Sequence, residues 1–426
     1  MSFLIIVTLL FLALPAYVYI GYPLLLWVLV FILKPNVHKQ SKITPTVTLV
    51  VSCYNEAAVI REKLKNCLAL AYPQEKLNIL IVSDASDDGT DDIVKEYESN
   101  RIKLIRQENR LGKTMGLNLA LQNVNSEIVV FSDANAMYAS DAILKLVRNF
   151  AQDNVGYVVG AALYIDKGTS SAADSEGMYW RYELAIKTLE SRLHSVVGGD
   201  GAIYAIRSSL WEPLQAEDIN DFVNPLQIIG KDFRGKFEPE AKCYEETAGS
   251  FDKEGKRKLR IVNRSFRGLL RVASVMNPVK YGFFALEVIS HKLLRWFIPF
   301  FITIGLVGSC ILSLMGSVPF ILIISTAWAL VVFAMVGMFT HERYQNVILS
   351  TPYYFIVVNL MAMLGIIKAL GGYTQITWES TRSDGENKKR ASSTPIGLLA
   401  FIVILTTLSV ILLSSLKALG IVDPMI

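Results

Sequence analysis

The chain has 426 residues, of which 52% are hydrophobic and 19% are charged, and its formal net charge is +4. Soluble proteins have a smaller apolar share and about a quarter charged residues, so this composition excludes an ordinary soluble enzyme. The varied, aromatic-rich composition also excludes a disordered or collagen-like chain. A chain made only of membrane helices would carry fewer charges. The averages therefore predict a polar domain joined to membrane segments.

Residues 1–33 form an apolar run without a charged side chain, long enough to cross a bilayer. A secretory signal peptide would have a basic start and a shorter apolar stretch, so we expect an N-terminal transmembrane helix. Lys34, Lys39 and Lys42 follow the run. By the positive-inside rule, the domain after it lies in the cytoplasm. The chain is thus predicted to be an integral protein of the plasma or inner membrane.

Residues 44–255 have the pattern of an α/β domain. Short apolar runs suit parallel strands buried on both faces, and apolar residues at helical spacing separate the first two of them. The runs are residues 47–52, 79–83, 102–105 and 128–132. Alternating strands and helices predict a doubly wound, Rossmann-like sheet. No glycine-rich dinucleotide motif follows the first run and no Walker phosphate loop occurs, which argues against nicotinamide, flavin and P-loop enzymes.

Polar residues stand where three of these runs end. Asn55 and Glu56 follow the first run, Asp84 ends the second and Asp133 ends the fourth. In open α/β sheets, ligands bind beyond the carboxyl ends of the strands. Any one of these residues alone would more often cap a helix, but their joint placement predicts a binding site.

A basic block separates this domain from the C-terminal membrane segments. Between Lys253 and Arg295 there are eleven Lys or Arg residues and two acids, so the rest of the chain is net negative. No nucleic-acid-binding motif accompanies the block, and a basic stretch beside apolar runs favours a membrane surface. We therefore predict basic amphipathic interfacial helices over residues 256–294.

The remaining chain is predicted to contain three more spans, two within residues 295–340 and one at residues 395–416. Residues 350–371 are apolar enough to cross, yet they contain Asn359 and Lys368. If they crossed, the basic loop of residues 372–394 would lie outside the cell, against the positive-inside rule. An interfacial or re-entrant helix keeps that loop in the cytoplasm and is the preferred interpretation.

Six motifs, taken together in their order, resemble glycosyltransferase family 2, the inverting nucleotide-sugar transferases with a GT-A fold. The resemblance covers about residues 47–271, and the membrane helices are placed as in the polysaccharide synthases of that family, which make hyaluronan, cellulose and poly-N-acetylglucosamine. The motifs are VVSCYNE, VSDASDDGTDD, ENRLGKTMGLNLAL, VVFSDANAMY, GGDGAIYAIR and INDFVNPLQIIGKDFRGKFEPEAKCYEE.

The resemblance implies a nucleotide-sugar site. Asp84, with Asn55 and Glu56, resembles the set that recognises uridine, and Lys113 resembles the basic residue that faces the diphosphate. Arg260 matches the arginine of the family's Gln-x-x-Arg-Trp motif, although the Gln and the Trp are both missing here. This departure weakens the implication of processive synthesis.

A divalent cation is also implied. Asp133 and Asn135 occupy the place of the family's Asp-x-Asp pair, whose oxygens hold Mg²⁺ or Mn²⁺ on the diphosphate. The second carboxylate is replaced by an amide, which removes one charge from the expected metal site.

Asp221 matches the family's catalytic base, which takes a proton from the acceptor hydroxyl. Asp218, three residues earlier, is the rival for that role. Other residues resemble those around the acceptor or in a gating loop over the donor. The acceptor set is Trp180, Gly199, Asp200 and Gly201, and the gating loop holds Trp378, Thr381 and Arg382.

Three functions remain open at this stage. The first is a membrane-embedded synthase that extends a β-linked polysaccharide from a UDP-sugar and passes it between its own helices. The second is a non-processive transferase that glycosylates a membrane lipid of the ceramide or polyprenyl-phosphate type. The third is a transport or assembly subunit with an inactive transferase domain, against which the Asp84, Asp133 and Asp221 set argues. The expected partners are a nucleotide-sugar donor, a glycan or lipid-linked acceptor and the bilayer.

Overall fold

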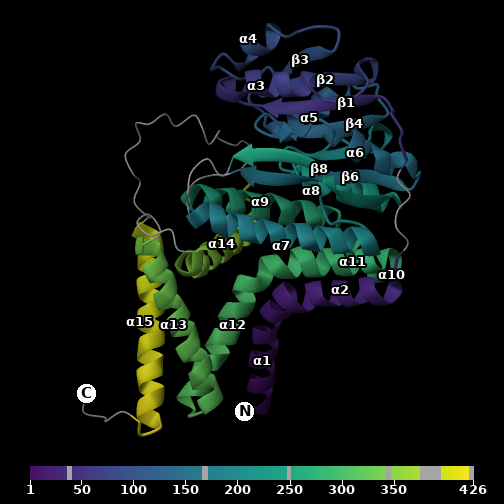
Figure 1. The fold of residues 1–426 in the computed structure, drawn as a ribbon. Coiled ribbons are helices and arrows are strands. Elements are labelled where there is room, and N and C mark those ends of the chain that lie inside the picture. The colour runs from purple at the N-terminus through teal and green to yellow at the C-terminus, as the bar shows by residue number, and fades with distance from the viewer. Residues whose placement is uncertain (36–40, 166–170, 247–250, 341–346, 375–394, 422–426) are drawn as a thin grey trace.

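Figure 1 shows two layers, a sheet with its helices above a group of long helices. The structure is a computed structural model. The residues that it describes are 1–35, 41–165, 171–246, 251–340, 347–374 and 395–421. The chain starts in the lower layer, builds the upper layer between β1 and β8, and returns to the lower layer at α9.

The upper layer is built on a mixed eight-stranded sheet with the order β3-β2-β1-β4-β7-β6-β8-β5. β1 pairs in parallel with β2 and β4, and β2 pairs in parallel with β3, so the four predicted strands form a parallel half. β7 is antiparallel to β4 and β6. The strands are β1 (Val47–Cys53), β2 (Leu77–Ser83), β3 (Ile102–Arg106), β4 (Ile128–Asp133), β5 (Met137–Tyr138), β6 (Val155–Ile165), β7 (Tyr204–Arg207) and β8 (Arg234–Glu246).

Helices cover the two faces of this sheet. They are α3 (Ala57–Leu68), α4 (Thr90–Lys95), α5 (Lys113–Leu121), α6 (Ala142–Val147), α7 (Ser171–Leu193) and α8 (Asn220–Gly230), with short 3₁₀ turns at Gln74–Lys76, Arg148–Ala151 and Ser208–Leu210. α7 lies on the side of the sheet that faces the lower layer (Figure 1).

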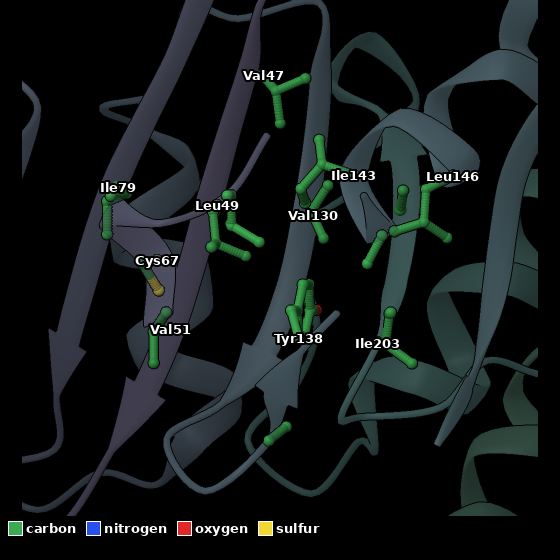
Figure 2. Close-up of a cluster of buried hydrophobic side chains, with 14 of the residues drawn as sticks. Val47, Leu49, Val51, Cys67, Ile79, Val130, Tyr138, Ile143, Leu146 and Ile203 are labelled. Atoms are coloured by element: carbon green, nitrogen blue, oxygen red, sulfur yellow. The ribbon is translucent and has the colours of Figure 1, made fainter. Parts of the chain in front are cut away.

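The apolar runs of the sequence become the core of the sheet. Leu49 and Val51 of β1 and Val130 of β4 are completely buried, and Figure 2 shows them beside Ile143 and Leu146 of α6. Full burial of such a side chain contributes about 1.5–3 kcal/mol. This packing fixes the carboxyl ends of β1, β2 and β4 at one edge of the domain.

The lower layer contains four helical stretches long and apolar enough to cross a membrane: Ser2–Leu33, Phe283–Leu314, Val318–Phe339 and Thr351–Leu370. The described part of a further apolar helix, Val403–Ala418, is shorter. The elements are α1 (Ser2–Ala16), α2 (Tyr22–Leu33), α9 (Phe251–Arg271), α10 (Pro278–Tyr281), α11 (Phe283–Val288), α12 (Leu294–Leu314), α13 (Val318–Thr340), α14 (Val347–Leu370) and α15 (Pro395–Ala418), with a 3₁₀ turn at Ala273–Met276.

Two of these stretches bend at π-helical segments, at Tyr17–Gly21 between α1 and α2 and at Ile289–Leu293 between α11 and α12. Inserted residues of this kind bend a helix. The hydroxyls of Tyr17 and Ser290 lie 2.9 Å apart, so the two bends are in contact. As Figure 1 shows, α2 and α11 run beneath the sheet domain while α1 and α12 run away from it. The apolar run of residues 1–33 is therefore bent instead of forming one straight helix.

α14 lies against α9. A Cβ atom at Gly365 would stand only 2.9 Å from the carbonyl oxygen of Leu259 and 3.2 Å from the backbone nitrogen of Asn263, so the backbones of the two helices approach each other closely. Asn263 donates to the carbonyls of Gly365 (3.2 Å) and Tyr373 (2.9 Å). α14 and α15 have equal lengths of 24 residues, yet α14 is strongly foreshortened in Figure 1, so it crosses the direction of α15. The interfacial orientation of α14 stays a prediction.

Candidate active site

Lys113, Asp133 and Asp221 converge on Gly201. A Cβ atom at Gly201 would lie 3.3 Å from Lys113 Nζ, 3.3 Å from Asp221 Oδ2 and 3.5 Å from Asp133 Oδ2. Lys113 Nζ also forms an ion pair with Asp133 Oδ1. The structure thus brings together four predicted site residues from four separate parts of the chain.

The three charged residues each stand at or near the end of a regular element. Asp133 is the last residue of β4, Lys113 is the first of α5 and Asp221 lies in the first turn of α8. Gly201 belongs to the loop before β7, and this loop is tied to α8 because Gly199 N–H donates to the carbonyl oxygen of Asp221. The site is therefore fixed by the sheet and by helix starts.

The charges in this cluster act on one another. Burial raises the pKa of Asp221, Lys113 lowers it, and Asp200 and Asp133 raise it further, with a net increase. For Lys113, burial by itself lowers the pKa, but the carboxylates of Asp133 and Asp221 outweigh burial and raise it. Lys113 therefore stays charged, and Asp221 is a stronger proton acceptor than an ordinary aspartate.

Arg260 of α9 reaches the same cluster. Burial and the neighbouring Arg257 lower the pKa of Arg260, while Asp133 and Asp221 raise it, so the guanidinium interacts electrostatically with both carboxylates. The basic helix predicted from residue 256 onward thus supplies a cation to the site as well as the contact with α14.

Glu245 belongs to this cluster and was missed by the sequence analysis. It lies near the end of β8, opposite Tyr164 of β6. Burial raises the pKa of Glu245 to about 8, with further increases from Asp133 and Asp200. The one available signal was its position at the end of a strand within the motif KCYEE.

Asp84 lies beside this cluster with one carboxylate oxygen saturated. Its Oδ1 accepts hydrogen bonds from Gln107 Nε2 (2.7 Å), Leu111 N (2.9 Å) and Gly112 N (3.0 Å). Its Oδ2 is buried and has no hydrogen-bond partner among the described residues. Burial raises the pKa of Asp84. A buried acceptor without a partner is costly, so this oxygen is suited to a ligand that donates a hydrogen bond.

Asn55 and Glu56 connect the loops that follow β1 and β2. Asn55 has a left-handed backbone (φ 52°), donates to Asp87 Oδ1 at 2.7 Å and accepts from Asp87 N at 3.0 Å. Glu56 N donates to Thr90 Oγ1 at 2.9 Å. Both residues thus lie at the edge where Asp84 stands, and their described contacts hold the two loops together.

The residues predicted to border the acceptor form a second group. Asp200 is 3.4 Å from Lys187 Nζ, and that ammonium lies 4.8 Å from the centre of the Trp180 ring. The indole N–H of Trp180 donates to the carbonyl oxygen of Ala162, which ties the ring to β6. The role of Trp180 in acceptor binding stays a prediction. Trp378, Thr381 and Arg382 lie outside the described residues.

Asp218 is held away from a role as base. Its Oδ1 forms an ion pair with Arg271 of α9, and its Oδ2 accepts a hydrogen bond from Gln215 N at 2.9 Å. Arg264 donates to the main-chain carbonyl of the same residue. Asp218 therefore anchors the segment before α8 to α9, while Asp221 faces Lys113 and Gly201.

Asp133 and Asn135 are two oxygen-bearing residues that could hold a cation. They are separated by one buried residue, Ala134, and both are partly exposed. Among the described residues, no group of three or more His, Cys, Asp or Glu side chains has a metal-binding arrangement. Two oxygen donors fit a cation such as Mg²⁺, which commonly takes its other ligands from water and substrate phosphates. Asp133 and Asp200 both raise the pKa of Glu245, and this concentration of carboxyl groups also favours a cation here.

Comparison with known proteins gives three similarities. Residues 48–212 match the family model described as glycosyl transferase family 2. The chain is 24% identical over 217 residues to a poly-β-1,6-N-acetyl-D-glucosamine synthase of Staphylococcus epidermidis, and 28% identical over 218 residues to that of Staphylococcus aureus strain COL. Each alignment covers 49% of this chain and 52% of the relative, so the chain spans about half the length of these curated relatives.

Among solved structures, a mannosyltransferase from Pyrobaculum calidifontis in complex with GDP-Man and Mn²⁺ is similar in fold. Its TM-score is 0.64 at 22% sequence identity, over 85% of this chain and 99% of that one. The predicted combination of a GT-A domain with apolar membrane-type helices is confirmed by this similarity and by the helices of the lower layer.

Proposed function

We propose that this glycosyltransferase, whose residues 48–212 match the glycosyl transferase family 2 model and whose fold is similar to that of a mannosyltransferase, adds sugars from a UDP-linked donor to a growing β-linked polysaccharide and passes the product between its own membrane helices. The observation that carries the proposal is the convergence of Lys113, Asp133 and Asp221 on Gly201. The proposed base Asp221, the ammonium group of Lys113 and the proposed metal-binding carboxylate of Asp133 meet there. Helices apolar enough to cross a membrane belong to the adjoining layer.

Asp221 is the general base in this proposal. Its carboxylate takes the proton from the acceptor hydroxyl as that oxygen attacks the anomeric carbon of the donor. The raised pKa strengthens it as a base. One in-line displacement inverts the anomeric configuration, so an α-linked donor gives a β-linked product.

Lys113 and Arg260 bind the diphosphate leaving group in this scheme. Arg260 offers a planar fork that suits phosphate oxygens, and Lys113 supplies a compact charge at the start of α5. Asp133 and Asn135 would hold the divalent cation, which neutralises negative charge on the diphosphate when it is bound. Asp84 Oδ2 accepts a hydrogen bond from the uracil edge.

The proposed orientation puts the catalytic domain in the cytoplasm with α9 and α14 along the membrane surface. The donor then arrives from water and the acceptor from the membrane side. Supporting this arrangement, Arg260 of α9 interacts electrostatically with Asp133 and Asp221 while Asn263, three residues further on, contacts α14. One basic helix thus borders both the site and the apolar helices.

The test is a transfer assay on membranes that contain the full chain, with labelled UDP-sugars and Mg²⁺ or Mn²⁺, followed by sizing of the product. We expect a polymer with the wild type and at least a hundredfold lower rate with Asp221→Asn, since base catalysis contributes about 10²–10⁴-fold. Asp153→Asn, an exposed site far from the cluster in the fold, is the control and should be unaffected. Normal rates in Asp221→Asn would refute the assignment of the base.

A second candidate is a transferase that adds one sugar to a membrane lipid. It is favoured by the sequence around Arg260, where Arg257 and Ile261 stand in place of the Gln and Trp of the synthase motif. The same assay separates the two functions, because a lipid with a single sugar migrates as a small organic-extractable product and a polymer does not.

A further inference from the structure

Lys63 of α3 is completely buried behind the turn that carries Asp133. A buried ammonium is costly unless hydrogen bonds compensate for lost hydration. Its Nζ donates to Ser132 Oγ at 2.8 Å and to the carbonyl oxygen of Ala136, and it lies 4.4 Å from the centre of the Tyr138 ring. The ammonium therefore holds the chain immediately before and immediately after the Asp133-Ala134-Asn135 turn.

Asn66, one helical turn further along α3, adds a second pair of hydrogen bonds between this helix and the chain after the turn. Its side chain donates to the carbonyl of Tyr138 at 2.9 Å and accepts from the Tyr138 N–H at 2.8 Å. The Tyr138 hydroxyl lies 3.1 Å from each of two carbonyl oxygens, those of Phe131 and Ala202. Because Ala202 follows Gly201, the contacts of α3 reach from the turn to the loop at the centre of the site.

Burial alternates along the turn. Ala134 and Ala136 are buried, whereas Asp133 and Asn135 are partly exposed. The contacts with α3 lie on the buried side, and the two oxygen-bearing side chains lie on the other. The turn therefore leaves both of these residues partly accessible while Lys63 holds its two ends.

We propose that Lys63 is a positioning residue for the cation site: its ammonium fixes the turn after β4 so that the Asp133 carboxylate and the Asn135 amide present their oxygens together. Because an amide replaces the second carboxylate, the site attracts a cation less strongly. Cation binding therefore depends more on a turn that is already held in the binding conformation. The inference rests on the proposed function, because that function supplies the cation and the diphosphate.

The first experiment measures amide hydrogen exchange of the full chain in detergent, without ligand, for wild type, Lys63→Met and Lys65→Met. Methionine keeps most of the buried length and removes the hydrogen bonds. Lys65 is exposed on the same helix and is the matched control. We expect faster exchange over residues 132–138 in Lys63→Met and wild-type exchange in Lys65→Met. Equal protection of the turn in all three proteins would overturn the proposal.

The second experiment measures Mn²⁺ binding in the presence of UDP by the loss of the free Mn²⁺ electron paramagnetic resonance signal. Removal of residues that orient metal ligands typically costs about 10–100-fold in affinity, and we expect a loss in that range for Lys63→Met. If the Lys63→Met protein is folded and binds Mn²⁺ with wild-type affinity, Lys63 does not position the cation ligands and the proposal is wrong.

Ser132→Ala keeps the experiment decisive if Lys63→Met does not fold, because it removes one acceptor of the ammonium and leaves the lysine in place. We expect a smaller loss of Mn²⁺ affinity in this variant, and an unchanged affinity would count against the proposal. A wild type that binds no Mn²⁺ with UDP would contradict the proposed function instead, while the exchange comparison would still decide whether Lys63 holds the turn.

Discussion

Lys113 of α5 forms an ion pair with Asp133 of β4 at the centre of the candidate site. The pair joins the residue proposed to bind phosphate to the residue proposed to bind the cation. The side chain of Asp133 is 37% exposed, so solvent or a ligand can reach it. A diphosphate with its cation would meet both partners at once, with Lys113 on its oxygens and Asp133 on the metal.

Replacing Lys113 by Met tests this relationship. The variant keeps the length of the side chain and loses its charge, so we expect the transfer rate to fall roughly a hundredfold, as when one electrostatic stabiliser of a leaving group is removed. Lys103→Met, at an exposed position on β3, should transfer at the wild-type rate. The initial rate at saturating donor is the measurement, and an undiminished rate would remove Lys113 from the diphosphate site.

Replacing Asp84 by Asn is expected to weaken donor binding. Asp84→Asn keeps the shape of the side chain but places an amide beside the N–H groups of Leu111 and Gly112. A hydrogen bond to a charged group contributes about 1.5–3 kcal/mol, so we expect the KM for a UDP-sugar to rise about 10–100-fold with a smaller change in kcat.

Asp92→Asn is the control for Asp84, because its ion pair with Lys95 is exposed at the surface. KM should be unchanged in that variant. If kcat falls in Asp84→Asn while KM stays at the wild-type value, the residue acts on the chemical step and the assignment to uridine is wrong.

The sequence predicted the parallel half of the sheet and the residues at its strand ends, because short apolar runs and the polar residues after them are local signals. Asp84 and Asp133 were located in this way, whereas Lys113 and Asp221 were located through the resemblance of their motifs to the family. Glu245 was missed because its role depends on the pairing of β8 with β6, a contact between distant segments.

Lys63 and the helix bends escaped sequence analysis for related reasons. Lys63 lies on a helix whose other buried residues include Ile60, Leu64 and Cys67, and periodicity cannot show that a lysine points inward toward a turn 69 residues away. The bends at the π-helical segments leave the apolar runs unbroken. Hydropathy detects the length of such a run and is insensitive to its direction.

The raised pKa of Glu245 leads us to predict that folding stability depends on pH. The folded state raises the pKa of this carboxyl from 4.5 to about 8, so the folded protein holds a proton that the unfolded chain releases. The contribution of Glu245 to folding stability is thus fully present below pH 4.5 and is lost progressively as the pH rises toward 8. Glu245→Gln removes this loss. We expect its melting temperature to match that of the wild type near pH 4.5 and to exceed it at pH 8.5.

The measurement for Glu245 is thermal unfolding by tryptophan fluorescence in detergent across that pH range. Glu240→Gln, at an exposed position on the same strand, should show no such gain at pH 8.5, because its partner Arg148 lowers the pKa of Glu240. A wild type whose stability rises between pH 4.5 and 8 relative to Glu245→Gln would contradict the assignment of a raised pKa.

Gly201 offers a test of the convergence itself. In Gly201→Ala the new methyl group would lie 3.3 Å from both Lys113 Nζ and Asp221 Oδ2, closer than ordinary van der Waals contact, and would occupy space between the proposed base and the proposed diphosphate site. A displacement of reacting groups by about 1 Å can cost about 10²-fold in rate, and the shift needed here is smaller, so we expect transfer to fall about tenfold. Gly230→Ala, where a Cβ meets no atom within 4 Å, should leave transfer unchanged. Equal rates in the two variants would show that the reaction does not take place between Lys113 and Asp221.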